Sequence, residues 1–334
     1  MKSTILANCL LVTLSAMHSP CCGTTLLRDD FSGNSLNQAV WRLPTGPGTF
    51  FGRTQIRPPS QPPVVDNGVV TLLLDTHNPT ALTPGDSFWG HEIQTFQSYS
   101  VETGLSIKSR LRFVDTPPGG LVGGFFTFGL DFPIRDEIDF ELLSNAIGTQ
   151  TILTNVFEDD DFNQGGDAAN VFAPGLDITE FAEYEIRWLP DRIEWFVNGT
   201  IVRREFDTVT DDPQEVRINL WAPNQFFGIA YNPALQPVAN AAQNEQFSLE
   251  VDFVEISRLP AGDLDASGSV DGSDFLDWQR DTVGNPLAAD DLATWLSAYG
   301  APLAAASVPE PTTTATILLY GLLAVLPRRR SHCR

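Results

Sequence analysis

The stretch Asp136-Glu137-Ile138-Asp139-Phe140-Glu141 alternates acidic and apolar side chains. In a β-strand alternate side chains share a face, so Glu137, Asp139 and Glu141 are expected on one surface, with the apolar residues between them facing the opposite layer. Acidic residues are poor strand formers, and like charges placed side by side must be neutralised, solvated or bound. The stretch therefore predicts a strand with a chemical role, in preference to an exposed strand that carries acids by chance.

Short alternating runs continue on both sides of this stretch, from Leu26 to about Arg258, separated by Gly, Pro, Asn and Asp. Asn198-Gly199 lies between two such runs and is the strongest hairpin signal in the chain. No helical stripe of comparable length occurs in this part of the sequence. The pattern predicts an antiparallel all-β sandwich, with Trp188 and Trp195 of the hairpin in its core.

The chain of 334 residues is strongly acidic, with 42 acidic against 20 basic side chains and a formal net charge of −22. Phosphate binding requires clustered Lys and Arg, so nucleic acids and anionic membrane surfaces are unfavourable partners. Neutral polysaccharide is compatible with this charge. The histidines are scattered without metal-ligand spacing, so no catalytic zinc and no other cofactor for catalysis is expected.

The first residues, Met1-Lys2 and an apolar run from Ile5 to Ala16, predict a secretory signal peptide over residues 1–24. All four cysteines lie in or next to this segment or at position 333. A disulfide framework and a thiol nucleophile are therefore not expected in the folded part of the chain. The protein is predicted to be secreted to the cell surface or extracellular matrix of a bacterium.

The segment 308–334 contains Val-Pro-Glu-Pro, an apolar run over 312–326 and three consecutive arginines. The run is short for a membrane span, but its terminal position and the basic stop favour a tail that contacts the membrane. The segment resembles the bacterial PEP-CTERM sorting tail. That resemblance implies processing by exosortase-type machinery and a transient membrane anchor.

A change in composition at residues 259–262 marks the end of the β-rich part, and a calcium-loop pattern follows. Oxygen donors occupy loop positions 1, 3, 5, 7, 9 and 12, with glycine at position 6. The predicted metal ligands are Asp263, Asp265, Ser267, Ser269, Asp271 and Asp274. The loop and the helix expected after it resemble a dockerin repeat. That resemblance implies a small helical dockerin-like module over 260–301 with one Ca²⁺ site, and a cohesin-type partner remains open because the second repeat is incomplete.

Two carboxylates that flank a sugar linkage are the usual equipment for glycoside hydrolysis, and the central strand offers them in Glu137 and Glu141. A gap of about 5 to 5.5 Å between the carboxyl groups gives a retaining mechanism, whereas about 6.5 to 9.5 Å gives an inverting one. Spacing in the sequence leaves both open. Asp139, between them, is expected to bond the nucleophile and to separate the pKa values of the two glutamates.

The motif Glu137-Ile-Asp-Phe-Glu141 resembles the signature of glycoside hydrolase family 16. The order of the flanking motifs also agrees, namely Gly120 to Phe128, Tyr184 to Gly199 and Ile218 to Trp221. The resemblance implies a concanavalin-like β-jelly-roll over 25–259, with Glu137 as nucleophile, Asp139 as assisting acid and Glu141 as acid/base in a retaining mechanism. One residue separates Asp139 from Glu141, which is typical of the lichenase and xyloglucan-enzyme side of the family.

The same resemblance supplies the expected substrate contacts, which are Trp221, Asn155, Trp89, His91 and Arg135. Arg135 lies where the lichenase pattern has an aromatic residue, and His91 lies where relatives often have arginine or glutamate. The sequence thus predicts a secreted retaining endo-β-glycanase that hydrolyses O-glycosidic bonds in a β-glucan or a related polysaccharide. A transglycosylase on the same scaffold and a non-catalytic glycan-binding surface protein are the alternatives.

Overall fold

The computed structural model describes residues 21–44, 49–162, 165–265, 267–280 and 289–299. Most of the predicted signal peptide and the whole predicted sorting tail lie outside the described residues. None of the helices in these ranges is both long and apolar enough to cross a membrane.

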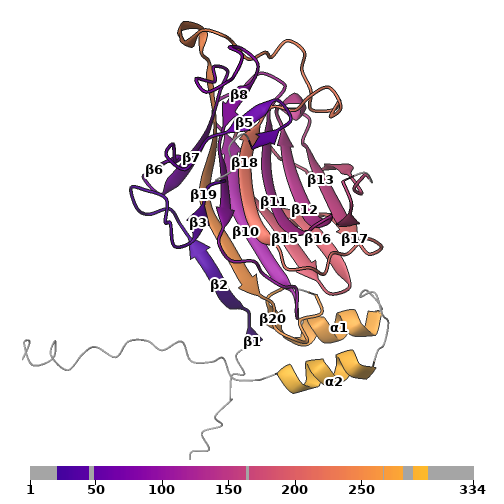
Figure 1. The fold of residues 1–334 in the computed structure, drawn as a ribbon. Helices are drawn as coiled ribbons and strands as arrows, with labels where there is room; N and C mark the ends of the chain where they lie inside the picture. Colours follow the sequence, from indigo (N-terminus) through magenta and orange to yellow (C-terminus); the bar gives the residue numbers. More distant parts are fainter. Residues whose placement is uncertain (1–20, 45–48, 163–164, 266, 281–288, 300–334) are drawn as a thin grey trace, which may run out of the picture.

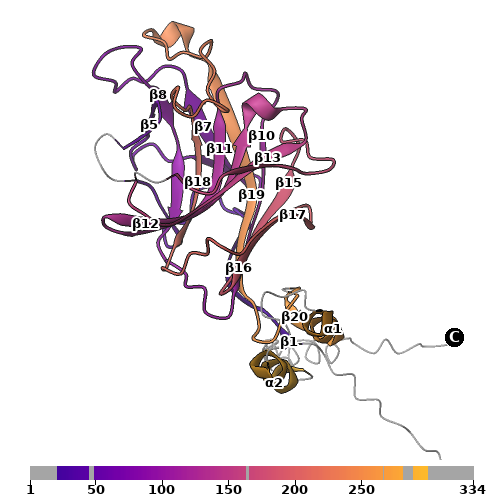
Figure 2. The ribbon, with the colours of Figure 1, turned by 90° about the vertical axis from the view of Figure 1, so that its right-hand side faces the viewer.

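Two β-sheets packed face to face form the body of the protein (Figures 1 and 2). The seven-stranded sheet has the order β14 (Ala169–Phe172), β13 (Thr151–Asp160), β12 (Ile134–Leu143), β11 (Val122–Asp131), β18 (Glu215–Trp221), β9 (Glu92–Thr95) and β3 (Trp41–Arg42). The eleven-stranded sheet has the order β17 (Thr200–Glu205), β16 (Arg192–Val197), β15 (Ala182–Leu189), β10 (Leu105–Phe113), β19 (Gln246–Arg258), β7 (Val69–Asp75), β8 (Phe88–Gly90), β5 (Thr54–Ile56) and β4 (Phe50–Phe51), with β2 (Thr24–Asp29) on β19 and β6 (Val64–Asp66) on β7. The expected all-β jelly-roll sandwich is confirmed.

The space between the sheets is filled by apolar and aromatic side chains from both layers. Ile138 and Phe140 of β12 are fully buried there, as their alternation with the acids predicted. Trp188 and Trp195 are also fully buried, which confirms their predicted place in the core. Each such side chain contributes about 1.5 to 3 kcal/mol on transfer from water, so this layer holds β12 in register and turns its acids outward.

The hairpin between β16 and β17 turns at Asn198 and Gly199, which have φ values of 48° and 73°. Positive φ at both central residues is what a tight two-residue hairpin requires, and Asn and Gly tolerate it at low cost. The predicted hairpin is confirmed. Outside the sheets, short 3-10 turns occupy Ser144–Ala146 and Ala241–Gln243.

A small unit follows β19 at one end of the sandwich (Figure 1). It contains β20 (Ser269–Val270), which pairs with β1 (Cys21–Cys22), and the helices α1 (Gly272–Arg280) and α2 (Ala289–Ala298). The rings of Phe275 and Trp295 pack the helices together at 5.0 Å between centroids. Helices therefore occur where they were expected, and the identity of the unit as a dockerin module stays a prediction.

The small unit is joined to the sandwich by hydrogen bonds as well as by the chain. Arg192 donates from Nη2 to the carbonyl oxygen of Leu264 at 3.0 Å, and Gly23 donates from its backbone N–H to Gly268 at 3.0 Å. The strand β1 and the first residue of β2 fall inside the segment predicted as signal peptide. A cleavage at residue 24 would therefore remove the strand that pairs with β20.

Candidate active site

Glu137, Asp139 and Glu141, here called the acid row, lie on the face of β12 that points away from the core. Residues of the neighbouring strands β11 and β18 share this face because directly opposed residues in an antiparallel sheet do. The acid row lines one pocket together with Phe51, Gly124, Phe126, Asn219 and Trp221. Strands distant in sequence thus assemble one acidic pocket.

Burial and mutual repulsion shift the protonation of the acid row. Burial and the charge of Glu137 raise the pKa of Glu141 to about 8, so that Glu141 holds a proton at neutral pH. Burial and the charges of both glutamates raise the pKa of Asp139 well above its usual range. Burial also raises the pKa of Glu137, but the Arg135 guanidinium and a hydrogen bond with Asp139 act in the opposite direction. Glu137 is therefore the member most favoured to carry the charge.

The backbone of the acid row is fastened to the second sheet. Trp195 of β16 donates its indole N–H to the carbonyl oxygen of Asp139 at 3.0 Å. The bond crosses the core beneath the pocket. The position of Asp139 therefore depends on the packing of both sheets.

Asn219, which lines the pocket, and Glu92, its buried partner, are residues that the sequence did not single out. The Asn219 amide donates to Glu92 Oε2 at 3.0 Å, and its buried Oδ1 has no hydrogen-bond partner within the described structure. Glu92 is fully buried. Asn219 belongs to the motif Ile218 to Trp221, and the alternation of side chains along β9 and β18 is the signal that could have selected both residues.

Two of the predicted substrate residues lie beside the acid row. Trp221 lines the pocket and packs between Phe227, at 6.0 Å, and Phe51, at 6.5 Å between ring centroids. Asn155 of β13 is directly opposite Asp139 in the ladder and shares its face. A partly buried indole beside carboxylates offers a stacking surface for a sugar ring, whose C–H faces are apolar.

The structure does not support His91 and Trp89 as substrate contacts. His91 is 2% exposed; its Nδ1 accepts from the Leu73 N–H and its Nε2 lies 3.0 Å from the Gln61 carbonyl oxygen. Burial and the nearby Arg57 lower the pKa of His91 to about 3, so the ring is neutral and both nitrogens serve the backbone. Trp89 is on β8 of the other sheet, with the Arg57 guanidinium 4.1 Å above its ring. Neither residue lines the pocket of the acid row.

Arg135 was predicted as a substrate contact, and the structure places it against the acid row instead. Its Nη1 donates to Glu137 Oε2 at 2.6 Å and its Nε donates to Asp160 Oδ2 at 2.9 Å. The side chain is 19% exposed. Arg135 therefore acts on a carboxylate of the pocket, and its charge is already engaged.

A larger cavity of about 580 Å³ lies elsewhere, between Trp41 of β3, the proline-rich stretch 59–63 and Phe96. Among the described residues that line this cavity, none carries a carboxylate, and Arg42 is the one charged member. It contains no acid or base pair that could carry out chemistry on a bound molecule. The smaller pocket of the acid row is the better candidate for the active site.

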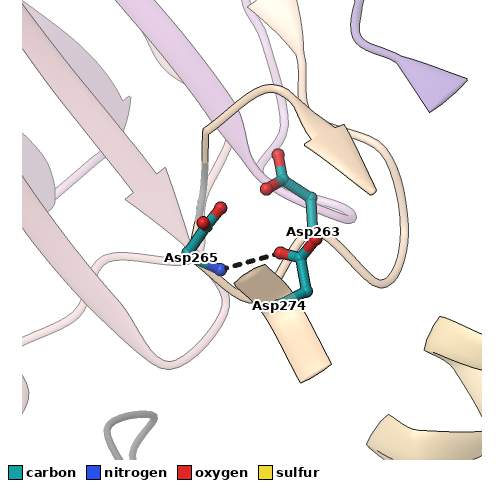
Figure 3. Close-up of side chains that lie close together, drawn as sticks. All are labelled: Asp263, Asp265 and Asp274. Carbon is teal, nitrogen blue, oxygen red and sulfur yellow. Dashed lines mark hydrogen bonds between the residues drawn. The ribbon is translucent and has the colours of Figure 1, made fainter. Parts of the chain in front are cut away.

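The predicted calcium loop brings three carboxylates together (Figure 3). Oxygen atoms of Asp263, Asp265 and Asp274 lie within 4.8 Å of one another, and Asp274 also accepts a hydrogen bond from the Asp265 N–H at 3.1 Å. Asp271 stands outside this group, since its Oδ1 accepts from the Ser273 N–H and caps α1. Ser267 and Ser269 are bonded to each other across the loop, through the Ser267 hydroxyl and the Ser269 carbonyl oxygen.

The donor set of the loop suits calcium. Hard oxygen ligands from carboxylates, a hydroxyl and a carbonyl are what Ca²⁺ prefers. No salt bridge reaches Asp263, Asp265 or Asp274 from any cation in the described ranges, and backbone N–H groups donate to all three carboxylates. The residues present thus fit the ion.

Comparison with known proteins places this geometry in a family. The family model described as "Glycosyl hydrolases family 16" matches residues 63–235, which is just over half of the chain. A β-glucanase of Brevibacillus brevis is 34% identical over 107 residues, 30% of this chain and 39% of the relative. A putative xyloglucan endotransglucosylase/hydrolase protein 1 of Arabidopsis thaliana is 29% identical over 146 residues, 40% of this chain and 48% of the relative. The chain thus spans less than half the length of these two curated relatives.

Solved structures agree on the fold. A prokaryotic β-1,3-1,4-glucanase (lichenase) from a mouse hindgut metagenome superposes with a TM-score of 0.55 at 20% identity, covering 71% of this chain and all of the other. An endo-β-1,3-glucanase of Pyrococcus furiosus gives 0.55 at 20% identity, covering 71% of this chain and 94% of the other. The acid row therefore lies on a scaffold shared with these structures, and the chain belongs to glycosyl hydrolases family 16.

Proposed function

We propose that the protein is a retaining endo-β-glycanase that hydrolyses O-glycosidic bonds in a β-glucan or a related polysaccharide. The observation that carries this proposal is the geometry of the acid row, which puts Glu137 and Glu141 on one strand face and in one pocket. Arg135 donates a hydrogen bond to Glu137, whereas burial and the charge of Glu137 raise the pKa of Glu141 to about 8, so the two glutamates divide the roles of anion and acid. A general acid and a nucleophile on one strand face are what double displacement requires. A glycan-binding protein without activity has no need of this division.

In the first step the Glu137 carboxylate attacks the anomeric carbon while Glu141 gives its proton to the departing glycosidic oxygen. A covalent glycosyl ester on Glu137 forms and the leaving chain departs as an alcohol. In the second step Glu141, now a carboxylate, takes a proton from water, whose oxygen attacks the anomeric carbon and releases Glu137. Asp139, held by a hydrogen bond to Glu137, stabilises its charge before the attack and after the release.

The choice of a β-glucan rests on the motif and on the relatives. One residue separates Asp139 from Glu141, and the similar proteins carry the names β-glucanase and xyloglucan endotransglucosylase. Transglycosylation is the second candidate, because the partly buried aromatic group of Trp221, Phe51 and Phe227 offers a surface on which an acceptor sugar can stack. In that case the acceptor hydroxyl takes the place of water in the second step.

The roles of the two glutamates are separable with alanine variants and azide. Glu137→Ala is expected to abolish reducing-end release, and added azide should then yield a glycosyl azide with inverted configuration because azide fills the space of the nucleophile. Glu141→Ala with azide should give the retained product. Glu250→Ala, which removes a carboxylate from β19 in the other sheet, is the matched control. Wild-type activity in Glu137→Ala would contradict the assignment.

A panel of lichenan, laminarin, xyloglucan, agarose, porphyran and carrageenan, with product analysis, identifies the substrate. Release of new reducing ends indicates hydrolysis, whereas redistribution of chain lengths at constant reducing ends indicates transglycosylation. If no polysaccharide in the panel changes, the binding alternative stands.

We also propose that the loop of Asp263, Asp265 and Asp274 holds one Ca²⁺, supported by three converging carboxylates without a cationic partner in the described chain. Secretion, processing of the 308–334 tail at the cell surface and a cohesin-type partner are further proposals that rest on the sequence. Mass measurement of the mature protein from the producing bacterium checks both ends, because each processing step removes a predicted segment.

A further inference from the structure

Arg135 precedes Glu137 by two positions on β12 and shares its face. The planar guanidinium bonds two carboxylates at once. Its Nη1 donates to Glu137 Oε2 at 2.6 Å, and its Nε donates to Asp160 Oδ2 at 2.9 Å. Hydrogen bonds between ionised partners are stronger than neutral ones, and a guanidinium holds two acceptors in fixed directions. The contact therefore orients the Glu137 carboxylate as well as attracting it.

The guanidinium is itself held in place by two aromatic rings. The rings of Phe157 and Phe162 lie 3.9 and 4.9 Å from its central carbon. Cations stack favourably on aromatic faces, and the stacking restricts rotation of the long side chain. Arg135 is thus fixed before any substrate arrives, so that the entropy of ordering it is not lost during the reaction.

An irregularity in the sheet brings Asp160, the second carboxylate that Arg135 bonds, within hydrogen-bond distance. Glu137 is opposite Phe157, but Arg135 is opposite Asp160, so two residues of β13 face one residue of β12 at this point. Asp136 fastens the bulge, since its Oδ1 accepts from the Asp159 N–H at 2.8 Å and its Oδ2 from two N–H groups of the 211–212 turn. The extra residue places the Asp160 carboxylate beside Arg135.

Charged groups from every strand around Glu137 act on its protonation. Glu92 of β9 and burial favour the neutral acid, whereas Arg135 of β12 and Arg217 of β18 favour the carboxylate, as does the hydrogen bond with Asp139. Glu141, also on β12, is coupled to Glu137 by charge repulsion. Arg217 is engaged with Glu215 and stacked on Phe128. Arg135 is therefore the cation in direct hydrogen-bond contact with Glu137.

We propose that Arg135 is a positioning residue of the reaction, which orients the Glu137 carboxylate and supplies its counter-charge. The inference rests on the proposed function, because it assigns Arg135 a task only if Glu137 is the nucleophile. The same contact assists the second step, in which Glu137 leaves the anomeric carbon as a carboxylate and regains its partner.

The test compares Arg135→Met and Arg135→Lys with Arg110→Met. Arg110 is the matched control because it also pairs with one carboxylate, Asp252, and lies over a phenylalanine ring, yet it is on β10 of the other sheet. Loss of an adjacent opposite charge should move the acid limb of the kcat/KM profile of Arg135→Met upward by about 1 to 3 pH units. Arg135→Lys keeps the positive charge but cannot hold two carboxylates in fixed directions. Its acid limb should therefore stay near that of the wild type, while kcat falls because the Glu137 carboxylate is less well oriented. Arg110→Met should match the wild type in both.

A second readout does not depend on activity. Carboxyl-¹³C glutamate labelling, with the Glu137 signal assigned from Glu137→Gln, follows the titration of Glu137 in the free protein by NMR. An upward shift of the Glu137 titration midpoint in Arg135→Met, which is largely reversed in Arg135→Lys, supports the proposal.

If the wild type attacks no polysaccharide, the proposed function fails but this titration still reports the contact between Arg135 and Glu137. If the wild type is active and both the acid limb and the Glu137 titration are unchanged in both Arg135 variants, the inference is overturned and the function stands. Should Arg135→Met fail to fold, Arg135→Lys must still show the kcat loss at an unchanged acid limb, or the proposal is rejected.

Discussion

The indole N–H of Trp195, at the centre of the core, bonds the carbonyl oxygen of Asp139 at 3.0 Å. The bond joins β16 of one sheet to β12 of the other, directly under the acid row. A buried carbonyl that loses its hydrogen-bond donor still carries the cost of its desolvation. The bond between Trp195 and Asp139 therefore links the stability of the sandwich to the geometry of the pocket.

Trp195→Phe removes this donor and keeps most of the aromatic bulk. We expect the free energy of unfolding in urea to fall by about 1 to 3 kcal/mol, with a lower kcat because Asp139 is no longer fixed. Trp188→Phe is the matched control, since Trp188 is equally buried but donates to Thr210. Comparable destabilisation in both variants, with kcat lowered only in Trp195→Phe, is the expected result. Equal kcat values would show that the bond is structural alone.

The pH dependence of activity should reveal the proton on Glu141. With its pKa raised to about 8 by burial and by Glu137, Glu141 donates a proton below that pH and loses the ability above it. The alkaline limb of kcat/KM should therefore lie near pH 8. Glu141→Gln retains residual activity only on aryl glycosides whose leaving groups need no protonation. The pH profile of that activity should have no alkaline limb. A wild-type alkaline limb retained in that variant would assign the limb to another group.

Stability should change with pH for the same reason. Glu141 binds its proton more tightly in the folded than in the unfolded chain, so the unfolded state releases it first as the pH rises from about 4.5. The contribution of Glu141 to the free energy of unfolding is complete below that pH and is lost as the pH approaches 8. Glu141→Gln should be less sensitive to pH over this interval in urea titrations, and an unchanged dependence would contradict the shift.

Gly124 leaves the space that the Asn219 amide occupies. A Cβ at this position would lie 2.5 Å from Asn219 Oδ1, and Asn219 is held by its bond to Glu92. Gly124→Ala should displace the amide and lower kcat/KM, with about 1 to 3 kcal/mol lost from stability through overpacking. Gly228→Ala is the control, because a Cβ there meets nothing within 4 Å. A fully active Gly124→Ala would show that the amide position is unimportant.

Calcium removal tests the loop of Asp263, Asp265 and Asp274. Calcium at about 100 times its Kd should stabilise the small unit by about 2.7 kcal/mol, which chelation reverses. Calorimetric titration of the chelated protein should give one site, and Asp263→Asn should weaken it, whereas Asp252→Asn, on β19, should not. Equal heats for the wild type and Asp263→Asn would remove the site from this loop.

Sequence by itself determined the strand of the acid row, its orientation and the core behind it. A side-chain period of two can bury Ile138 and Phe140 in only one way, and Asn198-Gly199 specifies its turn through backbone conformation. These properties are local, so neighbouring residues are enough to predict them.

Tertiary structure alone decided which distant groups meet at the pocket. Glu92 and Asn219 are 127 positions apart and come together through the order of β9 and β18 in the sheet. The His91 side chain is buried, and both of its ring nitrogens bond backbone groups, of Leu73 and Gln61. Arg135 lies on the same face of β12 as Glu137, and a bulge that shifts the register of β13 brings Asp160 beside it. Register and strand order follow from the packing of the whole sandwich, and no short segment contains that information.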